Sequence, residues 1–189
     1  MEEVVRDYLT DQELDKLIKA DLPSEKLENV RDWFLFSCFT GLAYIDLKNL
    51  KIKHLHHENC KYWIRTRRQK INVKTNVPLL LFPMQIIQRH CPDFRTMEPD
   101  EPIFKIISNQ KMNDYLKELG EILKIPKKLT CHIARHTFAT TVTFNNGVPI
   151  ESVSSMLGNK HISTTQHYAK MLDKKLEEDM DVLGKKLRY

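Results

Sequence analysis

Residues 130–140 read TCHIARHTFAT, a stretch that predicts a helix with chemically active side chains on one face. Thr130 is a favourable N-cap residue. His132 and Arg135 lie three positions apart and would share a face, while Phe138 falls on the opposite, apolar side. Arginine grips phosphate through a planar fork, and histidine adds a donor or moves a proton. The pair suits an anion, although a solvated helix face would explain it equally well.

Three further stretches follow a definite order along the chain and fit the first. They are FTGLAYIDL at 39–47, RQK at 68–70 followed by VPL at 77–79, and LGNKHISTTQHYAK at 157–170. Together with residues 130–140, these stretches resemble the signature segments of the tyrosine recombinases, or phage-type integrases, from about Tyr8 to Lys170. The likeness is greatest to integrases of conjugative transposons.

The resemblance implies a role for each matched residue. Tyr168 falls at the nucleophile, which attacks a DNA phosphate and forms a 3′-phosphotyrosine intermediate. Arg135 falls at the second of the two family arginines, and His132 at the histidine that accompanies it. Lys70 falls at the hairpin lysine that protonates the leaving 5′ oxygen; Lys74 competes for this role, and we favour Lys70 for its distance from the VPL segment. The resemblance implies neither a metal nor a nucleotide cofactor.

Two positions depart from the family pattern. Ala43 stands where the family has its first arginine, and an alanine side chain cannot bind phosphate. Asn159 stands where the family has His or Trp; its amide can donate a hydrogen bond and assist catalysis but cannot shuttle a proton. Asp46 fits the family's acidic position, and we expect it to orient Arg135 or His132. Full activity would need a replacement cation, for which the candidates are Lys48, Arg67, Arg68 and His161.

Hydrophobic periodicity and capping residues predict a mostly α domain with one small antiparallel β-sheet, an α+β fold similar to the tyrosine recombinase catalytic domain. The segment with His54, His56 and His57 near Cys60 is expected to be a loop, and its spacing does not suit zinc. Helices are expected from the capping box at 10–13, over 24–41, at 46–50, 83–90, 113–123, 130–145 and 149–158, and from 163 and 173, with strands over 61–68 and 73–80.

The expected domain organisation is a catalytic domain at 1–171 followed by a C-terminal helix at 172–189. Family members usually carry an N-terminal domain that clamps the other side of the DNA, and we expect that domain to be absent here. Family members also pass a C-terminal helix to the next protomer, which implies a homo-oligomer, a tetramer, on DNA; packing on its own domain is the alternative. The helix has an apolar stripe formed by Leu172, Leu176, Met180, Leu183 and Leu187.

Charge and composition agree with a DNA-binding domain. The chain has 189 residues, 41% hydrophobic and 29% charged, and a formal net charge of +5, which leans mildly toward polyanions. Trp63 and Lys70 lie among a run of cations in the predicted hairpin, which suits contacts with the backbone of double-stranded DNA. Those cations are Arg65, Arg67, Arg68 and Lys74.

The remaining sequence features indicate the cellular compartment of the protein. The four cysteines show no Cys-x-x-Cys pair, which indicates reduced thiols in a cytoplasmic protein. The start is acidic and lacks a signal-peptide core, and no apolar run is long enough to span a membrane. The cysteines are Cys38, Cys60, Cys91 and Cys131.

The predicted function is therefore site-specific DNA recombination and integration of a mobile element, by an enzyme that breaks and rejoins DNA strands. Ala43 and Asn159 support an alternative, a catalytically impaired DNA-binding relic or a regulator of a mobile element. A purely helical interaction protein is a third possibility, against which the four ordered segments argue.

Overall fold

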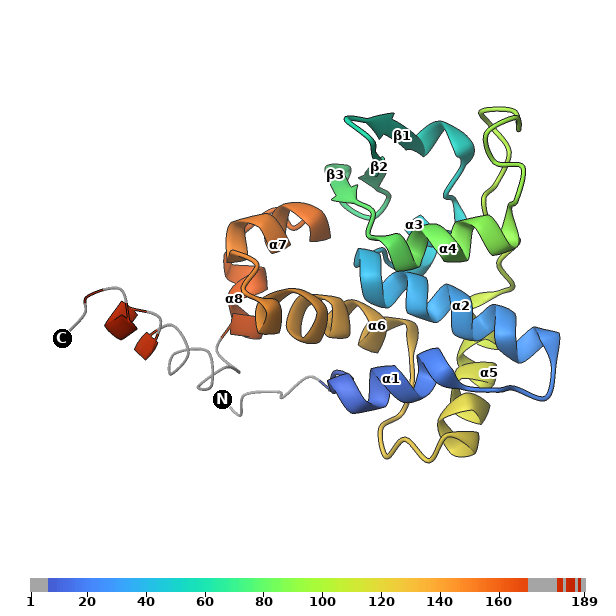
Figure 1. Cartoon of the computed structure of the whole chain (residues 1–189). Coiled ribbons are helices and arrows are strands. Elements are labelled where there is room, and N and C mark those ends of the chain that lie inside the picture. The colour runs from blue at the N-terminus through green and yellow to red at the C-terminus, as the bar shows by residue number, and fades with distance from the viewer. Residues whose placement is uncertain (1–6, 170–179, 182, 186, 188–189) are drawn as a thin grey trace.

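The computed structural model describes residues 7–169, 180–181, 183–185 and 187, and for residues 167–169 it describes the backbone. Its helices pack around the central helix α2 (Glu25–Thr40), and a small sheet lies to one side of them (Figure 1). The other elements are α1 (Asp11–Lys19), α3 (Tyr44–Lys48), η1 (Ile52–His54), β1 (Leu55–Glu58), β2 (Lys61–Arg68), β3 (Val73–Pro78), α4 (Leu81–His90), α5 (Asn109–Ile122), α6 (Cys131–Thr137), η2 (Phe138–Thr143), η3 (Phe144–Asn146), α7 (Ile150–Leu157) and α8 (Ser163–Ala169).

The helix boundaries follow from the capping residues. Thr10 and Glu13 form the predicted capping box at the start of α1, and Ser24 caps α2. Gly41 ends α2 with φ of 70°, a left-handed conformation that glycine adopts without strain. The mostly α fold with one small antiparallel sheet is confirmed.

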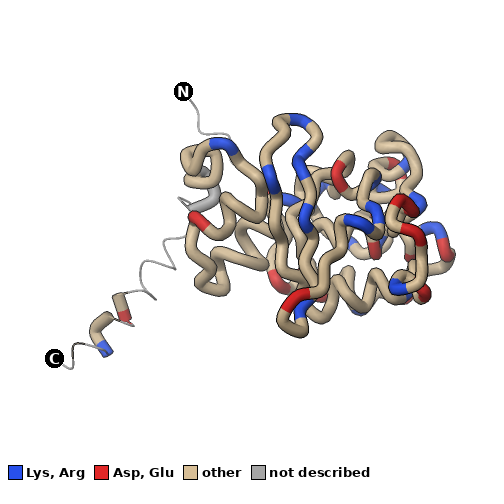
Figure 2. Tube along the Cα trace, turned by 90° about the horizontal axis from the view of Figure 1, so that it is seen from above, with Lys and Arg blue, Asp and Glu red and all other residues tan. Residues whose placement is uncertain are grey.

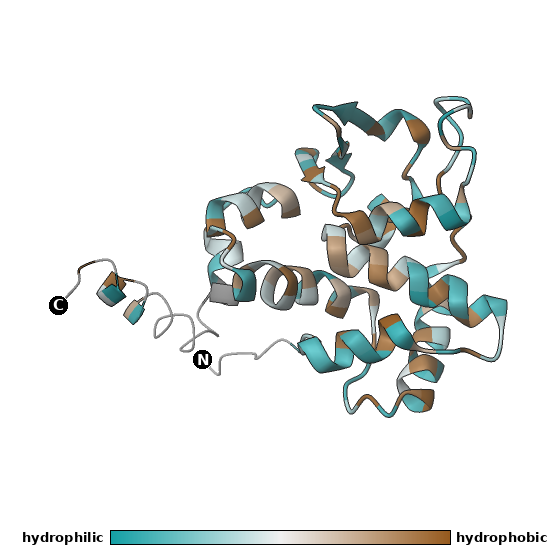
Figure 3. Ribbon diagram, in the orientation of Figure 1, coloured by the Kyte–Doolittle hydropathy of each residue, from teal (hydrophilic) through white to brown (hydrophobic). Residues whose placement is uncertain are grey.

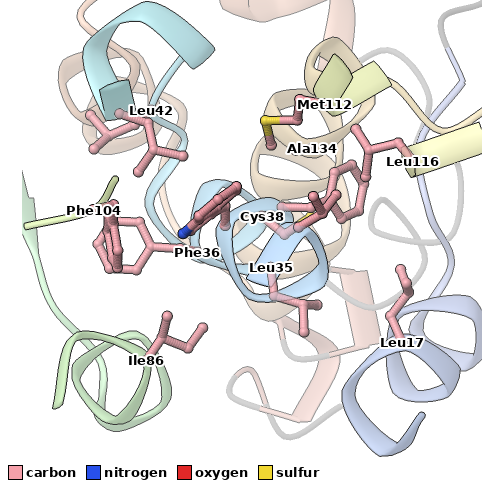
Figure 4. Packing of buried hydrophobic residues seen from close by; sticks show 14 of the residues in the cluster. Leu17, Leu35, Phe36, Cys38, Leu42, Ile86, Phe104, Met112, Leu116 and Ala134 are labelled. Atoms are coloured by element: carbon pink, nitrogen blue, oxygen red, sulfur yellow. The ribbon is translucent and has the colours of Figure 1, made fainter. Parts of the chain in front are cut away.

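Helix α2 is buried on more than one side. The sequence predicts a single apolar stripe that includes Phe34 and Cys38, but Leu35 and Phe36 are also buried (Figure 4). Phe36 packs edge-on against Phe104, with ring centroids 4.9 Å apart. A helix surrounded by neighbours can be apolar all round. Burial of each such side chain contributes about 1.5–3 kcal/mol, so α2 anchors the fold.

The sheet has three antiparallel strands in the order β1-β2-β3, and the expectation of a loop at residues 54–60 is wrong. Strand β1 joins β2 through Asn59 and Cys60, whose φ angles of 49° and 61° fit a two-residue hairpin turn. The prediction missed β1 because its sequence, LHHE, lacks the usual β-branched residues. Figure 3 shows the strands to be largely hydrophilic.

Helix α6 continues through the π-helical segment η2 and the short helix η3 before Gly147 ends the path. The sequence predicts one continuous helix here and gives no sign of the π segment. Thr143 donates to the carbonyls of Phe138 and Ala139, and such threonine bonds to the backbone loosen regular helix geometry. Thr137 accepts a hydrogen bond from the amide of Leu9 at 2.9 Å.

The hydroxyl of Thr141 donates to the carbonyl of Leu9, so both polar groups of that residue bond to the α6–η2 path. The chain that leads into α1 is thereby fixed to the helix that carries His132 and Arg135. Within the described ranges, no helix has both the length and the apolar composition needed to cross a bilayer.

Candidate active site

Arg135 is fixed at the junction of three segments. The residue is 6% exposed. Its Nη1 donates to the carbonyl of Gly41 at the end of α2, and its Nη2 donates to the carbonyl of Leu157 at the end of α7, both at 2.5 Å. Nη2 also donates to Oδ1 of Asn159 at 3.2 Å. A guanidinium held by backbone carbonyls keeps its charge and loses its freedom, which is the preorganisation that phosphate chemistry needs.

Asn159 joins Arg135 to two other parts of the site. Its Oδ1 accepts a second hydrogen bond, from Nη1 of Arg68 at 3.3 Å. Its Nδ2 donates to the hydroxyl of buried Thr165 in α8, at 2.9 Å. Helix α8 also carries the backbone of Tyr168, three residues later, whereas the Tyr168 side chain lies outside the described residues. In this structure the amide of Asn159 donates to Thr165, and its assistance to catalysis stays a prediction.

A close backbone approach brings the hairpin to this junction. Gly158 has φ of 60°, and a Cβ at this position would lie 2.3 Å from the hydroxyl of Thr75 and 3.7 Å from the Cβ of Arg68. Only glycine fits such a contact without displacement. The absence of a side chain at residue 158 therefore lets β3 and the end of β2 pack against the α7–α8 connection.

The two faces of the hairpin carry different cations. Successive side chains of a strand alternate between faces. Arg68 shares a face with buried Ile64, and this face meets Asn159. Arg65 and Arg67 lie on the opposite, exposed face. The four cations predicted to bind DNA thus divide into one that enters the site and three on the outer face, where Lys74 is paired in register with Arg67.

Lys70 lies exposed in the turn between β2 and β3, and its neighbour Gln69 is anchored from two sides. Oδ1 of Asp46 accepts from the amide of Gln69 at 2.9 Å, and Asn49 donates to the Gln69 side chain at 2.7 Å. The expectation that Asp46 orients Arg135 or His132 is therefore wrong, because its carboxylate holds the hairpin turn. Among the described residues, no hydrogen bond joins Lys70 to the Arg135 group.

His132 remains exposed on α6 while Arg135 turns inward. The imidazole of His132 stacks on that of His136, with centroids 5.6 Å apart and planes 12° from parallel. His132 and Arg135 are thus neighbours on one helix in different environments. The N-cap of α3 is Ala43, which brings no cation to the site.

A groove of about 690 Å³ lies on the outer face of the hairpin, between it and α3 with η1. It is lined by Arg65, Arg67 and Lys74, and also by His54, which the sequence did not single out as a groove residue. Burial, with Lys53 and Lys51 beside it, lowers the pKa of His54. Figure 2 shows the positions of lysine and arginine along the chain from above the sheet. Among the described residues, no three His, Cys, Asp or Glu side chains form a group that could hold a metal ion.

Comparison with known proteins identifies the family. Residues 7–175 match the family model described as the phage integrase family, which is most of the chain. The chain belongs to the phage integrase family. The sequence resemblance stated above is thereby confirmed, and with it the tyrosine recombinase type of catalytic domain.

Relatives of this phage integrase family member include tyrosine recombinases. The chain is 30% identical over 182 residues to tyrosine recombinase XerA of Pyrococcus furiosus, covering 92% of this chain and 60% of the relative. The chain thus spans less than two thirds of that relative's length.

Solved structures that share its fold include the following two. XerH site-specific recombinase bound to a palindromic difH substrate superposes with a TM-score of 0.71 at 21% identity, covering 93% of this chain and 53% of the other. The Tn1549 transposon integrase in complex with circular intermediate DNA superposes with a TM-score of 0.71 at 18% identity, covering 97% and 68%.

Proposed function

We propose that this integrase-family domain cleaves and rejoins DNA strands through a covalent bond to Tyr168. The observation that carries the proposal is the fixed guanidinium of Arg135, joined through Asn159 to helix α8, which bears Tyr168. Of the structural neighbours named above, XerH is described as bound to a palindromic difH substrate and the Tn1549 integrase as a complex with circular intermediate DNA. Double-stranded DNA is accordingly the proposed substrate, and the proposed location is the cytoplasm.

In the proposed step, the phenolic oxygen of Tyr168 forms a bond to the scissile phosphorus and the bond from phosphorus to the 5′ oxygen breaks. The phenol gives up its proton to water, and Lys70 supplies a proton to the leaving 5′ oxygen. Arg135 and His132 hold the phosphate oxygens. A free phenol has a pKa of about 10, so cations near the phosphate also favour the phenolate. The reverse step rejoins a strand, and neither direction requires a nucleotide.

Asn159 assists by positioning rather than by proton transfer. It accepts from Arg135 and donates to Thr165, which links the phosphate-binding arginine to the helix of the nucleophile. For the acid, we favour Lys70 over Lys74, because Lys74 lies on the face opposite to the one on which Thr75 meets Gly158. Contacts with the DNA backbone are assigned to the outer face of the hairpin, where Arg65, Arg67 and Lys74 line the groove.

The C-terminal helix is the proposed contact between subunits of a tetramer on DNA, with residues 1–171 as the catalytic domain. Leu172 and Leu176 of its apolar stripe lie outside the described residues. The other three, Met180, Leu183 and Leu187, are 65%, 43% and 52% exposed. Exposed apolar side chains at helical spacing gain free energy from a partner surface. Deletion after Met171 should leave a folded domain that assembles less cooperatively on a paired site, as sedimentation on DNA would show.

The test of the catalytic function is adduct formation on a nicked suicide substrate. The chain should become covalently attached to the DNA, and Tyr168→Phe should abolish the adduct while DNA affinity stays nearly unchanged. A persistent adduct in Tyr168→Phe would assign the nucleophile elsewhere. A chain that binds DNA but gives no adduct would instead be the catalytically impaired relic.

A further inference from the structure

The phosphate site lacks the cation that the family supplies after its Thr-Gly-Leu segment. Ala43 stands at that position as the N-cap of α3. Arg135 lies beside the same segment, because its Nη1 donates to the carbonyl of Gly41. A phosphoryl group in transfer spreads negative charge over its equatorial oxygens, and one guanidinium covers only part of it. A second cation must therefore come from another element.

Arg68 is carried to this position by the inward face of β2. Its Nη1 donates to Oδ1 of Asn159 at 3.3 Å, and Nη2 of Arg135 donates to the same oxygen at 3.2 Å. Two guanidinium groups from different elements thus lie within hydrogen-bond reach of a single atom. The packing of Gly158 against Thr75 and Arg68 supports this approach, because a Cβ at residue 158 would lie 2.3 Å from the Thr75 hydroxyl.

The positive charge of Arg68 is not balanced by its surroundings, which favours binding of an anion. The oxygen that it shares with Arg135 belongs to a neutral amide, so it does not balance either charge. Among the described residues, no carboxylate forms an ion pair with Arg68, and its buried Nε has no hydrogen-bond partner. A buried donor without a partner carries a free-energy cost that binding of a phosphate nearby can offset.

The other candidate cations are placed less well. Arg67 lies on the outer face and reaches the carbonyl of Asn72 in its own turn, at 3.5 Å. Lys48 is exposed at the end of α3, and His161 is exposed in the turn after Asn159. Within the described part of the chain, neither of these two side chains makes a hydrogen bond to Arg135 or Asn159.

We propose that Arg68 is a catalytic residue that binds the scissile phosphate together with Arg135, in place of the arginine missing at residue 43. This inference rests on the proposed function. Asn159 spaces the two guanidinium groups and presents both to the same phosphate. The role of the first family arginine is thus supplied by the hairpin strand rather than by the segment after α2.

The test compares cleavage rates on two nicked substrates, one with an ordinary scissile phosphate and one with a neutral methylphosphonate. On the ordinary phosphate, Arg68→Ala should cleave about 10²–10³-fold more slowly, the loss typical of one charge-stabilising donor. On the methylphosphonate, which has less charge to stabilise, the two proteins should differ much less. Arg67→Ala removes the same charge from the outer face and should lower DNA affinity with a far smaller loss of cleavage rate.

A second variant separates charge from position. Ala43→Arg should restore much of the cleavage lost in Arg68→Ala, because it returns a guanidinium from the family's own position. A defect of equal size on both substrates, with no rescue, would overturn the proposal and leave Arg68 with a purely structural role. Thermal melting of each variant checks the fold, and Arg68→Met keeps the apolar stem if Arg68→Ala melts early.

The two proposals fail in different ways. If the unmodified chain forms no adduct on the suicide substrate, the proposed function fails before Arg68 is tested. If the unmodified chain forms the adduct and Arg68→Ala cleaves as fast as Arg67→Ala, only the role of Arg68 is lost.

Discussion

The side-chain oxygen of Asn159 accepts a hydrogen bond from Arg135 at 3.2 Å, and this neutral acceptor orients the guanidinium without cancelling its charge. A carboxylate of the same shape would do both. The distinction between orientation and neutralisation gives the first prediction.

Asn159→Asp should reduce cleavage by about 10²-fold or more, because its carboxylate would pair with Arg135 and Arg68 and repel the phosphate. Asn159→Ala removes the contact without adding a charge and should lose less. Single-turnover adduct formation on a nicked substrate measures both. If the Asp variant cleaved faster than the Ala variant, Asn159 would not act as a neutral spacer.

Arg135→Lys keeps a positive charge but loses the fork that reaches Gly41 and Leu157. Cleavage should fall by about 10²–10³-fold, while DNA affinity changes by less than about tenfold, because the fork acts mainly on the transition state. Arg65→Lys, on the outer face, is the matched control and should affect both quantities only slightly. Equal losses of rate and affinity in Arg135→Lys would mean that Arg135 only positions DNA.

Gly158→Ala should destabilise the domain by about 1–3 kcal/mol, because an alanine at φ of 60° is strained and its Cβ would meet the hydroxyl of Thr75. Thr75→Ala in the same chain should recover the loss of stability that comes from the clash with the hydroxyl. The loss that comes from the strained φ of residue 158 should remain. Gly120→Ala is the control. Gly120 lies within α5, and a Cβ there would make an ordinary contact of 3.5 Å with the side chain of Leu129, so this variant should be as stable as the original or more so. Urea denaturation measures all four proteins. A fully stable Gly158→Ala would show that the hairpin does not press on this turn.

Acid should weaken the fold through Asp32. Burial by itself raises the pKa of this carboxyl, but hydrogen bonding to His90 and the charges of Arg31 and Arg89 outweigh it and leave the pKa lowered. Because the folded pKa lies below the unfolded value of about 3.9, the stabilisation is complete above that pH and disappears as the pH falls through the folded pKa.

In Asp32→Asn, the free energy of unfolding should therefore fall less steeply as the pH is lowered. At neutral pH it should cost about 3–5 kcal/mol, as for the loss of one partner of a buried ion pair. Denaturation in urea between about pH 3 and 7 measures this. Asp100, an exposed residue, pairs with Lys51 and Lys53, and Asp100→Asn is the control that should leave stability nearly unchanged. An unaltered fall in the free energy of unfolding with pH in Asp32→Asn would contradict the assignment.

DNA binding should weaken steeply with salt if the outer face of the hairpin contacts phosphates as proposed. Loss of one phosphate contact lowers the slope of log affinity against log salt by about 0.9, so Arg67→Ala should show a slope shallower by about that amount. Titration of a labelled duplex at several salt concentrations measures the slope. Affinity that does not change with salt would remove the hairpin from the DNA interface.

Local signals in the sequence predicted most of the fold, because capping residues such as Thr10, Ser24 and Gly41 act within one turn of a helix. They missed β1, whose LHHE sequence becomes a strand only by pairing with β2. They also missed the π segment η2, which depends on threonine bonds within a buried helix.

The candidate site was predicted as a set of residues and not as an arrangement. Arg135 and Asn159 were singled out separately, and only the fold joins them through one hydrogen bond. The orientation of Arg68 was partly readable, because it is four residues after Ile64 and so shares the buried face of β2. The contact between Asp46 and the hairpin turn required the tertiary structure, since the two lie 23 residues apart in sequence.

The attachment of Leu9 to Thr137 and Thr141 has a mechanical consequence. Both hydroxyls belong to the helical path that continues from Arg135, so tension or rotation applied to residues 7–9 acts on that path directly. The buried side chain of Leu9 prevents this segment from yielding independently. A force on the polypeptide before α1 is consequently coupled, through the helical path of α6 and η2, to the orientation of the Arg135 guanidinium.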